Sequence, residues 1–174
     1  GWTDVVDRAP VEANVSVTGG NNNVTLRQNV GAQSGYYNDK ATVDVKGDNN
    51  RVAAHQNGAN DSMALLISGT GNRIAAFQNG NGNVMRASAT AAAPGVLSNN
   101  QISASQYGDG NMMNLAISNG RNNVLNGVQY GNHNSMDITL AGGSNNKVTY
   151  NQYGDNLAYS LRTTSSNQVI NITQ

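Results

Sequence analysis

A short phrase recurs along the chain at a nearly fixed interval, and no other feature restricts the possible folds so strongly. It consists of an asparagine, an apolar residue two positions later, a small residue two positions after that, and then a glutamine. The clearest copies are Asn50-Val52-Ala54-Gln56, Asn72-Ile74-Ala76-Gln78 and Asn100-Ile102-Ala104-Gln106. A fixed period of this kind is the signature of a repeat architecture.

The glutamines define the period. They stand at positions 28, 56, 78, 106, 129 and 152, so the differences between successive copies are 28, 22, 28, 23 and 23. The base period is therefore the shorter spacing, about 22 to 23 residues, which lies in the range of known repeat folds. Two repeats contain insertions, which we place within Asn29–Asp39 and Thr90–Ser98. We expect both insertions to be loops that project from a regular scaffold.

Each repeat divides into two runs in which apolar and polar residues alternate, as they do in β-strands. In one repeat the runs are Ile74/Ala76 and Met85/Ala87/Ala89. Turns rich in Gly, Asn and Asp separate the runs, because these residues tolerate positive φ. We therefore predict an all-β fold, a β-solenoid of stacked strand-turn-strand rungs with a cross-β, amyloid-like arrangement.

Two repeats are less regular. In the fifth, the register Asn123-Leu125-Gly127-Gln129 fits the spacing. In the sixth, the best apolar phase is Leu157, Tyr159 and Leu161, after a turn that is one residue short.

The repeat also predicts the domain organisation. Residues 1–12 lie outside the pattern and are predicted to be a flexible N-terminal arm. The solenoid is predicted over residues 13–174, as a half repeat (13–21), six full repeats (22–166) and a second half repeat (167–174).

The half repeats predict two polymerisation ends. A rung without a neighbour exposes unpaired N–H and C=O groups that invite another strand. We predict that the two half rungs join head to tail, a contact that does not close and so generates a filament. The residues assigned to these ends are Val15, Val17, Asn167, Val169, Asn171 and Thr173.

Amide side chains recur at two positions of the repeat. A buried amide without a partner is costly, but in a stack each amide can donate to one neighbour and accept from the other, forming a ladder. The predicted asparagine ladder is Asn22, Asn50, Asn72, Asn100, Asn123, Asn146 and Asn167. The predicted glutamine ladder is Gln28, Gln56, Gln78, Gln106, Gln129 and Gln152.

The composition argues against several classes of partner. Ten basic residues balance ten acidic ones, so we expect no nucleic-acid partner and no attraction to an anionic membrane. The sequence contains no run of eighteen apolar residues and is not expected to be membrane-embedded. It has no cysteine. A start at Gly1 rather than Met is typical of a processed mature form and is compatible with export.

Catalysis is not expected. The carboxylates are scattered, and His55 and His133 lie at different phases of the repeat, so we predict no catalytic, metal or cofactor site. A column of Met63, Met85, Met113 and Met136 could suggest copper, but methionine more often fills gaps in a narrow core. Tyr107, Tyr130 and Tyr153 share a phase and could bind sugar, although packing at an exposed corner is the favoured interpretation.

The repeat resembles the curlin repeat of curli fibre subunits. The family phrase is roughly Ser-x5-Gln-x-Gly-x-Gly-Asn-x-Ala-x3-Gln, and its part Gln-x-Gly-x-x-Asn has three direct counterparts here. They are Gln78-Gly80-Asn83, Gln106-Gly108-Asn111 and Gln129-Gly131-Asn134. In two further copies the asparagine is displaced, to Asn60 and Asn156. The resemblance covers nearly everything from Asn14 to Gln174, with Asn in place of the leading Ser and the second Gln largely missing.

The resemblance implies a bacterial protein that is secreted and polymerises outside the cell. We expect a structural subunit, a major one rather than a nucleator, that forms functional amyloid fibres of the biofilm matrix for adhesion and cohesion. Its implied partners are itself, a nucleator subunit and an outer-membrane export channel. The alternative is a monomeric secreted β-solenoid that binds carbohydrate or acts as a surface adhesin.

Overall fold

The computed structural model of the chain describes residues 2–6, 11–30, 38–91 and 98–174. These residues form two parallel sheets, one of eight strands and one of seven. The first sheet, here sheet A, contains β1 (Trp2–Val6), β3 (Asn23–Val30), β5 (Arg51–Ala59), β7 (Arg73–Asn81), β9 (Gln101–Tyr107), β11 (Val124–Tyr130), β13 (Lys147–Tyr153) and β15 (Val169–Thr173). The second, sheet B, contains β2 (Val11–Thr18), β4 (Asp39–Lys46), β6 (Ser62–Ser68), β8 (Val84–Thr90), β10 (Met112–Ser118), β12 (Ser135–Ala141) and β14 (Ala158–Thr163).

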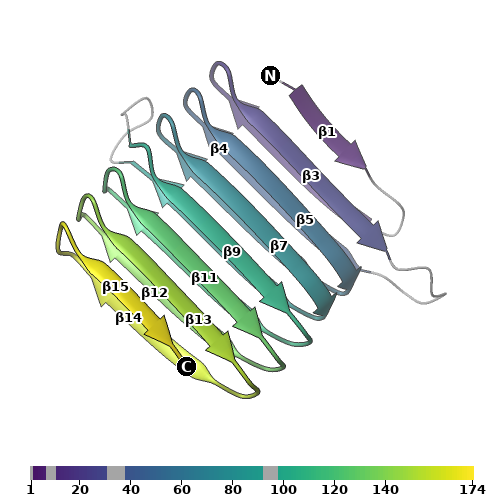
Figure 1. Cartoon of the computed structure of the whole chain (residues 1–174). Helices are drawn as coiled ribbons and strands as arrows, with labels where there is room; N and C mark the ends of the chain where they lie inside the picture. The colour runs from purple at the N-terminus through teal and green to yellow at the C-terminus, as the bar shows by residue number, and fades with distance from the viewer. Residues whose placement is uncertain (1, 7–10, 31–37, 92–97) are drawn as a thin grey trace.

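The chain alternates between the two sheets, so each pair of consecutive strands makes one rung of a stack (Figure 1). Neighbouring strands pair in parallel and keep equivalent positions of the repeat side by side, as in Val52↔Ile74 and Gln56↔Gln78. The predicted β-solenoid fold is therefore confirmed. The described residues form no helix that could cross a membrane.

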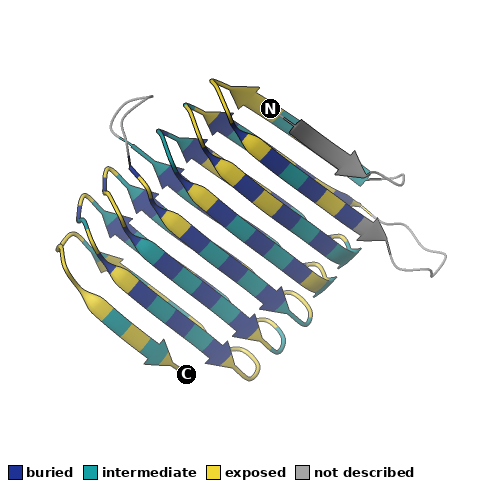
Figure 2. Ribbon diagram, turned by 45° about the horizontal axis from the view of Figure 1, so that its top comes forward, coloured by how far each residue is buried: buried dark blue, intermediate teal, exposed yellow. Residues whose placement is uncertain are grey.

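The core lies between the two sheets, and buried residues alternate with more exposed ones along the central strands (Figure 2). Sheet A contributes large and small side chains such as Ile74 and Ala76, and sheet B contributes others such as Leu115 and Ile117. The four methionines of the predicted column are at most 1% exposed and fill this core. In the fifth repeat Leu125 is buried and Gly127 takes the next inward position, as the predicted register requires.

Tight corners join the strands because the corner residues adopt positive φ. Asparagine occupies this conformation immediately before the ladder position, as in Asn49, Asn122 and Asn145. Glycine is needed where rungs approach most closely. A Cβ atom on Gly108 (φ 102°) would lie 2.2 Å from the carbonyl oxygen of Gly131 in the next rung.

The N-terminal prediction is wrong in one respect. Instead of belonging to a flexible arm, Trp2–Val6 forms β1, which pairs with β3 from Trp2↔Asn23 to Val6↔Arg27. Strand β2 begins at Val11, inside the range assigned to the arm. The N-terminal rung therefore has a strand in both sheets, and the expected half rung is absent from the isolated chain.

At the C-terminus the predicted phase is wrong by one residue. Ile170 and Ile172 face the core, whereas Val169, Asn171 and Thr173 are exposed. The turn before β14 has the same length as the others, because Leu157 occupies the position that Asn134 has in the preceding rung. The predicted apolar phase is nevertheless correct, since Tyr159 and Leu161 pack against the core; the leucine at the amide position only made the turn look one residue short.

The two insertions fall where the spacing places them, between β3 and β4 and between β8 and β9. Their central residues, 31–37 and 92–97, lie outside the described residues. On both sides of each insertion the strands keep their register, since Gln28 pairs with Gln56 and Ile74 pairs with Ile102.

Candidate assembly site at the ends of the amide ladders

The six predicted glutamines form one continuous line of side chains through sheet A. Each Nε2 donates to the Oε1 of the glutamine in the next rung, at distances of 2.8 to 3.0 Å from Gln28 to Gln152. All six side chains are at most 1% exposed. The second Nε2 hydrogen of each internal glutamine is donated to a main-chain carbonyl at the start of a sheet B strand. Gln78, for example, donates to Ser62 O.

A seventh member, Gln174, extends the ladder and was missed in the sequence. Gln152 Nε2 donates to Gln174 Oε1 at 3.4 Å, and the hydroxyl of Tyr150 donates to the same oxygen at 2.6 Å. The signal was present, because Gln174 follows Gln152 at the base period of the repeat.

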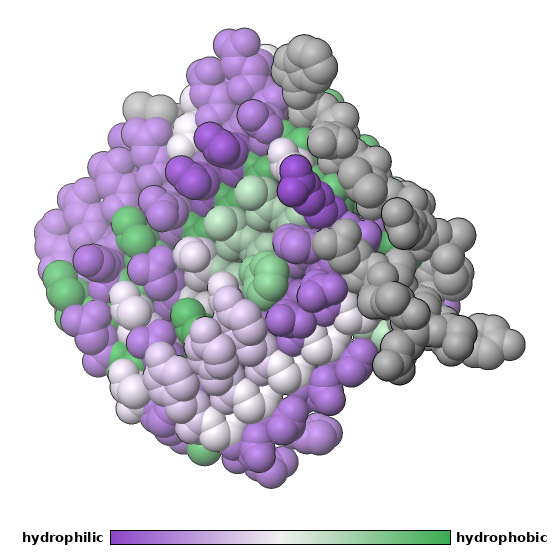
Figure 3. Space-filling model, turned by 45° about the vertical axis from the view of Figure 1, so that its right-hand side comes forward, coloured by the Kyte–Doolittle hydropathy of each residue, from purple (hydrophilic) through white to green (hydrophobic). Residues whose placement is uncertain are grey.

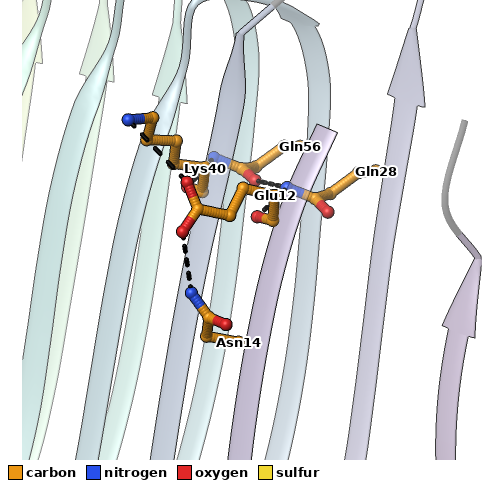
Figure 4. A network of polar contacts seen from close by, with 5 residues as sticks. All are labelled: Glu12, Asn14, Gln28, Lys40 and Gln56. Atoms are coloured by element: carbon orange, nitrogen blue, oxygen red, sulfur yellow. Dashed lines mark hydrogen bonds and ion pairs between the residues drawn. The ribbon is translucent and has the colours of Figure 1, made fainter. Parts of the chain in front are cut away.

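The ladder has a direction, so its two ends differ. At the N-terminal end, Gln28 Nε2 donates to Gln56, but Gln28 Oε1 is buried and receives no hydrogen bond from the described residues. Figure 4 shows the bond that leaves its nitrogen toward Gln56, while no bond reaches its oxygen. The last described pair between β1 and β3 is Val6↔Arg27, so no described residue of β1 lies beside Gln28.

At the C-terminal end the situation is reversed. Gln174 Oε1 accepts two hydrogen bonds, whereas Gln174 Nε2 donates none to the described residues. An unused donor at one end of the stack therefore matches an unused acceptor at the other. A buried polar group without a partner costs about 1–3 kcal/mol, so the unpaired Gln28 Oε1 substantially destabilises the isolated chain.

The asparagine column is real but its bonds differ from those predicted. Each Oδ1 accepts from the main-chain N–H at the equivalent position of the next rung, as in Asn72 N to Asn50 Oδ1 at 2.9 Å. Most of the Nδ2 groups donate instead to a turn carbonyl of the next rung, as Asn100 does to Gly120 O. These amides therefore stabilise the corners by hydrogen bonds to the main chain. Direct bonds between two amides, such as Asn72 Nδ2 to Asn50 Oδ1, are fewer.

Asn167 is not a member of this column. Gln168 takes the ladder position, since its N–H donates to Asn146 Oδ1 at 2.9 Å. Asn167 has φ 58° and lies in the row of positive-φ corner residues, where Asn145 Nδ2 donates to its Oδ1.

A third column of buried polar residues was not predicted. It lies at the start of the sheet B strands and comprises Asp39, Asp61, Asn83, Asn111 and Asn134. Each Oδ1 accepts the main-chain N–H of the next rung, as Asp61 Oδ1 does from Asn83 at 2.8 Å. The outer oxygens of the two aspartates, Asp39 Oδ2 and Asp61 Oδ2, are buried with no partner among the described residues.

Burial raises the pKa of Asp61 to about 7, and the charge of Asp39 in the preceding rung adds to the shift. Burial also raises the pKa of Asp39. The Asp61 carboxyl is therefore largely protonated below neutral pH. The sequence did not indicate this, because an acidic residue in a turn normally faces solvent.

The ends of the stack also leave apolar side chains incompletely covered. The hydrophobic residues that pack against the core without being fully buried all belong to strands beside the two ends: Ala13, Val15, Tyr159, Leu161, Ile170 and Ile172. In the middle of the stack the equivalent positions are covered by rungs on both sides. Each end therefore presents a strip of core and a sheet edge to solvent.

A row of aromatic rings runs along one corner of sheet A. Tyr107 and Tyr130 stack with centroids 4.4 Å apart and planes within 2°, and Tyr130 and Tyr153 stack at 5.6 Å. Because the rings cover each other's faces, few faces are left for a sugar to stack on. The arrangement agrees with packing at an exposed corner, since Tyr153 is 54% exposed.

A shallow groove of about 360 Å³ lies on the outer face of sheet A, with small residues such as Ala53, Ala75 and Ser103 in its lining. Figure 3 shows an apolar area on this side of the molecule bordered by strongly hydrophilic side chains. The groove contains His55 but no carboxylate. Within the described part of the chain, no three His, Cys, Asp or Glu side chains lie close enough together to hold a metal ion.

Comparison with family models, curated proteins and solved structures finds no match to this chain. The candidate site therefore rests on geometry alone, namely the two open ends of the amide ladders and the sheet edges beside them.

Proposed function

We propose that this protein is a structural subunit that assembles head to tail into an amyloid-like fibre. The single observation that supports this most strongly is the polarity of the glutamine ladder. Gln174 Nε2 has no acceptor and Gln28 Oε1 has no donor among the described residues. When the C-terminal end of one molecule meets the N-terminal end of another, one hydrogen bond satisfies both groups.

The sheet edges support the same joint. Both sheets are parallel throughout, so strands of a second molecule can continue them with the same direction and register. Strand addition at an open edge is a common route to association. The half-buried apolar residues at the two ends would then be covered from both sides, and hydrophobic burial would stabilise the contact.

The biological setting rests on the resemblance to curlin repeats. We propose that the fibre forms outside a bacterial cell, as part of a biofilm matrix that supports adhesion and cohesion. The partners proposed with it are further copies of the chain, a nucleator subunit and an outer-membrane export channel.

Incubation of the purified chain tests the proposal. Electron microscopy should reveal filaments, and aligned samples should diffract at about 4.7 Å along the axis and at about 10 Å across it, the strand and sheet spacings. Sedimentation distinguishes the alternative of a monomeric binding solenoid. A chain that stays monomeric for days at high concentration would refute the fibre proposal.

A further inference from the structure

Within the described residues, the two sheets contain different numbers of strands. Sheet A has eight and sheet B has seven, because β1 and β15 lie at opposite ends of the same sheet. In a filament of identical molecules, both sheets must advance by the same number of strands per molecule, because strands are spaced about 4.8 Å apart in both. Eight strands in sheet A and seven in sheet B do not satisfy this condition. Stacking the molecules unchanged would therefore leave a gap of one strand in sheet B at every joint.

Strand β1 is the element whose removal corrects the difference. Without it, each sheet contributes seven strands, and a joint would place β15 of one molecule against β3 of the next. Strand β14 would then meet β2 in sheet B, and β15 and β2 would together form one complete rung.

We propose that β1 is an exchangeable cap, displaced during growth by β15 of a second copy of this chain. The inference rests on the proposed fibre function and specifies the segment that controls its growth site. In the isolated chain β1 covers the edge of β3, and in the filament the partner's C-terminal strand takes its place.

The fit of the two strands to β3 favours the exchange. The described residues of β1 pair with five residues of β3, whereas β5 pairs with eight on the other side. β15 reaches further than β1, because Gln174 makes main-chain hydrogen bonds beyond the strand, with Tyr153 N donating to Gln174 O at 2.8 Å. Placed on β3 in the common register, β15 brings Gln174 beside Gln28, and β1 has no described residue at that position.

The cap would also keep separate chains from joining before growth begins. A covered β3 edge slows addition of another molecule, and charged or protected edges have this role in many sheets. Growth then requires β1 to leave, which makes displacement of this strand a barrier at each addition.

A reversible disulfide tests the cap. Asp4 and Thr25 are Cα partners in β1 and β3, and the chain has no cysteine, so Asp4→Cys with Thr25→Cys gives one defined pair. The strand spacing of about 4.8 Å lies within the Cα separation that disulfides accept. The matched control is Ala53→Cys with Ala75→Cys, the same column in β5 and β7, which do not separate in the proposed exchange.

Seeded growth is then followed with each variant oxidised and reduced. The oxidised β1–β3 pair should lose elongation on seeds of the unmodified chain and regain it on reduction, while the control pair should elongate in both states. Equal elongation of the oxidised and reduced β1–β3 pair would overturn the cap. If the unmodified chain itself formed no filament, the fibre proposal would fail instead, and the two failures are distinguishable.

Removal of residues 1–6 provides a second test that needs no crosslink. The truncated chain should elongate faster than the full chain, because no strand has to leave β3. Slower elongation would mean that β1 belongs to the filament and would contradict the exchange.

Discussion

Gln28 Nε2 and Gln56 Oε1 lie 2.8 Å apart although 28 residues separate them, and Gln56 reaches Gln78 in the same way across 22. The ladder therefore passes an insertion without interruption. What the repeat keeps constant is the position of the amide in the rung, and the length of chain between two amides varies.

A substitution inside the glutamine ladder should destabilise the fold. Gln106→Leu removes the acceptor of one Gln78 Nε2 hydrogen and the donor to Gln129 Oε1, leaving one buried N–H and one buried oxygen without partners. We expect a loss of about 2–4 kcal/mol, since each orphaned group costs about 1–3 kcal/mol and the sites can partly relax. Chemical denaturation measures it, with Gln101→Leu on the exposed face of the same strand as the control. An equal effect of the two substitutions would argue against the ladder.

Close approach of rungs at the corners gives a second prediction. Gly108→Ala would place a methyl group against the carbonyl of Gly131, in addition to the strain of an alanine at φ 102°. Gly142→Ala provides the matched control, because Gly142 also has positive φ but nothing lies within 4 Å of the added Cβ. We expect Gly142→Ala to cost about 1 kcal/mol and Gly108→Ala at least ~2 kcal/mol more. Thermal unfolding of both variants would test whether the contact between rungs, and not φ alone, requires glycine.

The buried carboxyl groups predict a pH dependence. Asp61 ionises near its ordinary pKa of 3.8 in the unfolded chain but near about 7 when folded. The folded state therefore holds an extra proton between these values, and stability should fall as the pH rises from about 4 to about 7, then level off. The raised pKa of Asp39 acts in the same direction.

Asp61→Asn isolates this effect, because the next three rungs already have asparagine in the column. The variant should be more stable than the parent by about 1–3 kcal/mol at pH 8 and show a weaker pH dependence, with the remainder due to Asp39. Asp137→Asn, on an exposed position of β12, removes a carboxyl group outside the buried column and serves as the control. An unaltered profile in Asp61→Asn would show that other groups control the pH response.

The sequence predicted the regular part of the fold because two independent periods agree there. The alternation of apolar residues assigns the strands, and the spacing of Gln56, Gln78 and Gln106 assigns the rungs. Core burial and amide hydrogen bonding recur in every rung, so the residues that meet these needs recur at a fixed spacing in the sequence.

The wrong or missing predictions concern residues at which this repeated pattern is interrupted. Strand β1 has neither ladder amide nor clear alternation, so only its pairing with β3 reveals it. Asn167 was mistaken for a ladder residue because two adjacent positions favour asparagine, one for its positive φ and one for its amide, and Gln168 occupies the second. The buried state of Asp61 depends on its neighbours in three dimensions, which residue type alone does not specify.

The most direct test of the central claim is seeded growth of Gln174→Glu. A carboxylate can still accept the hydrogen bonds from Gln152 and Tyr150, so the isolated chain should keep its stability, but it cannot donate to Gln28 of the next molecule. Asn171→Asp introduces the same charge on the exposed face of the same strand and serves as the control. We predict elongation about tenfold slower, or more, for Gln174→Glu than for Asn171→Asp, as expected for at least ~1.4 kcal/mol lost at the joint. Equal elongation rates for the two variants would contradict a joint made through the glutamine ladder.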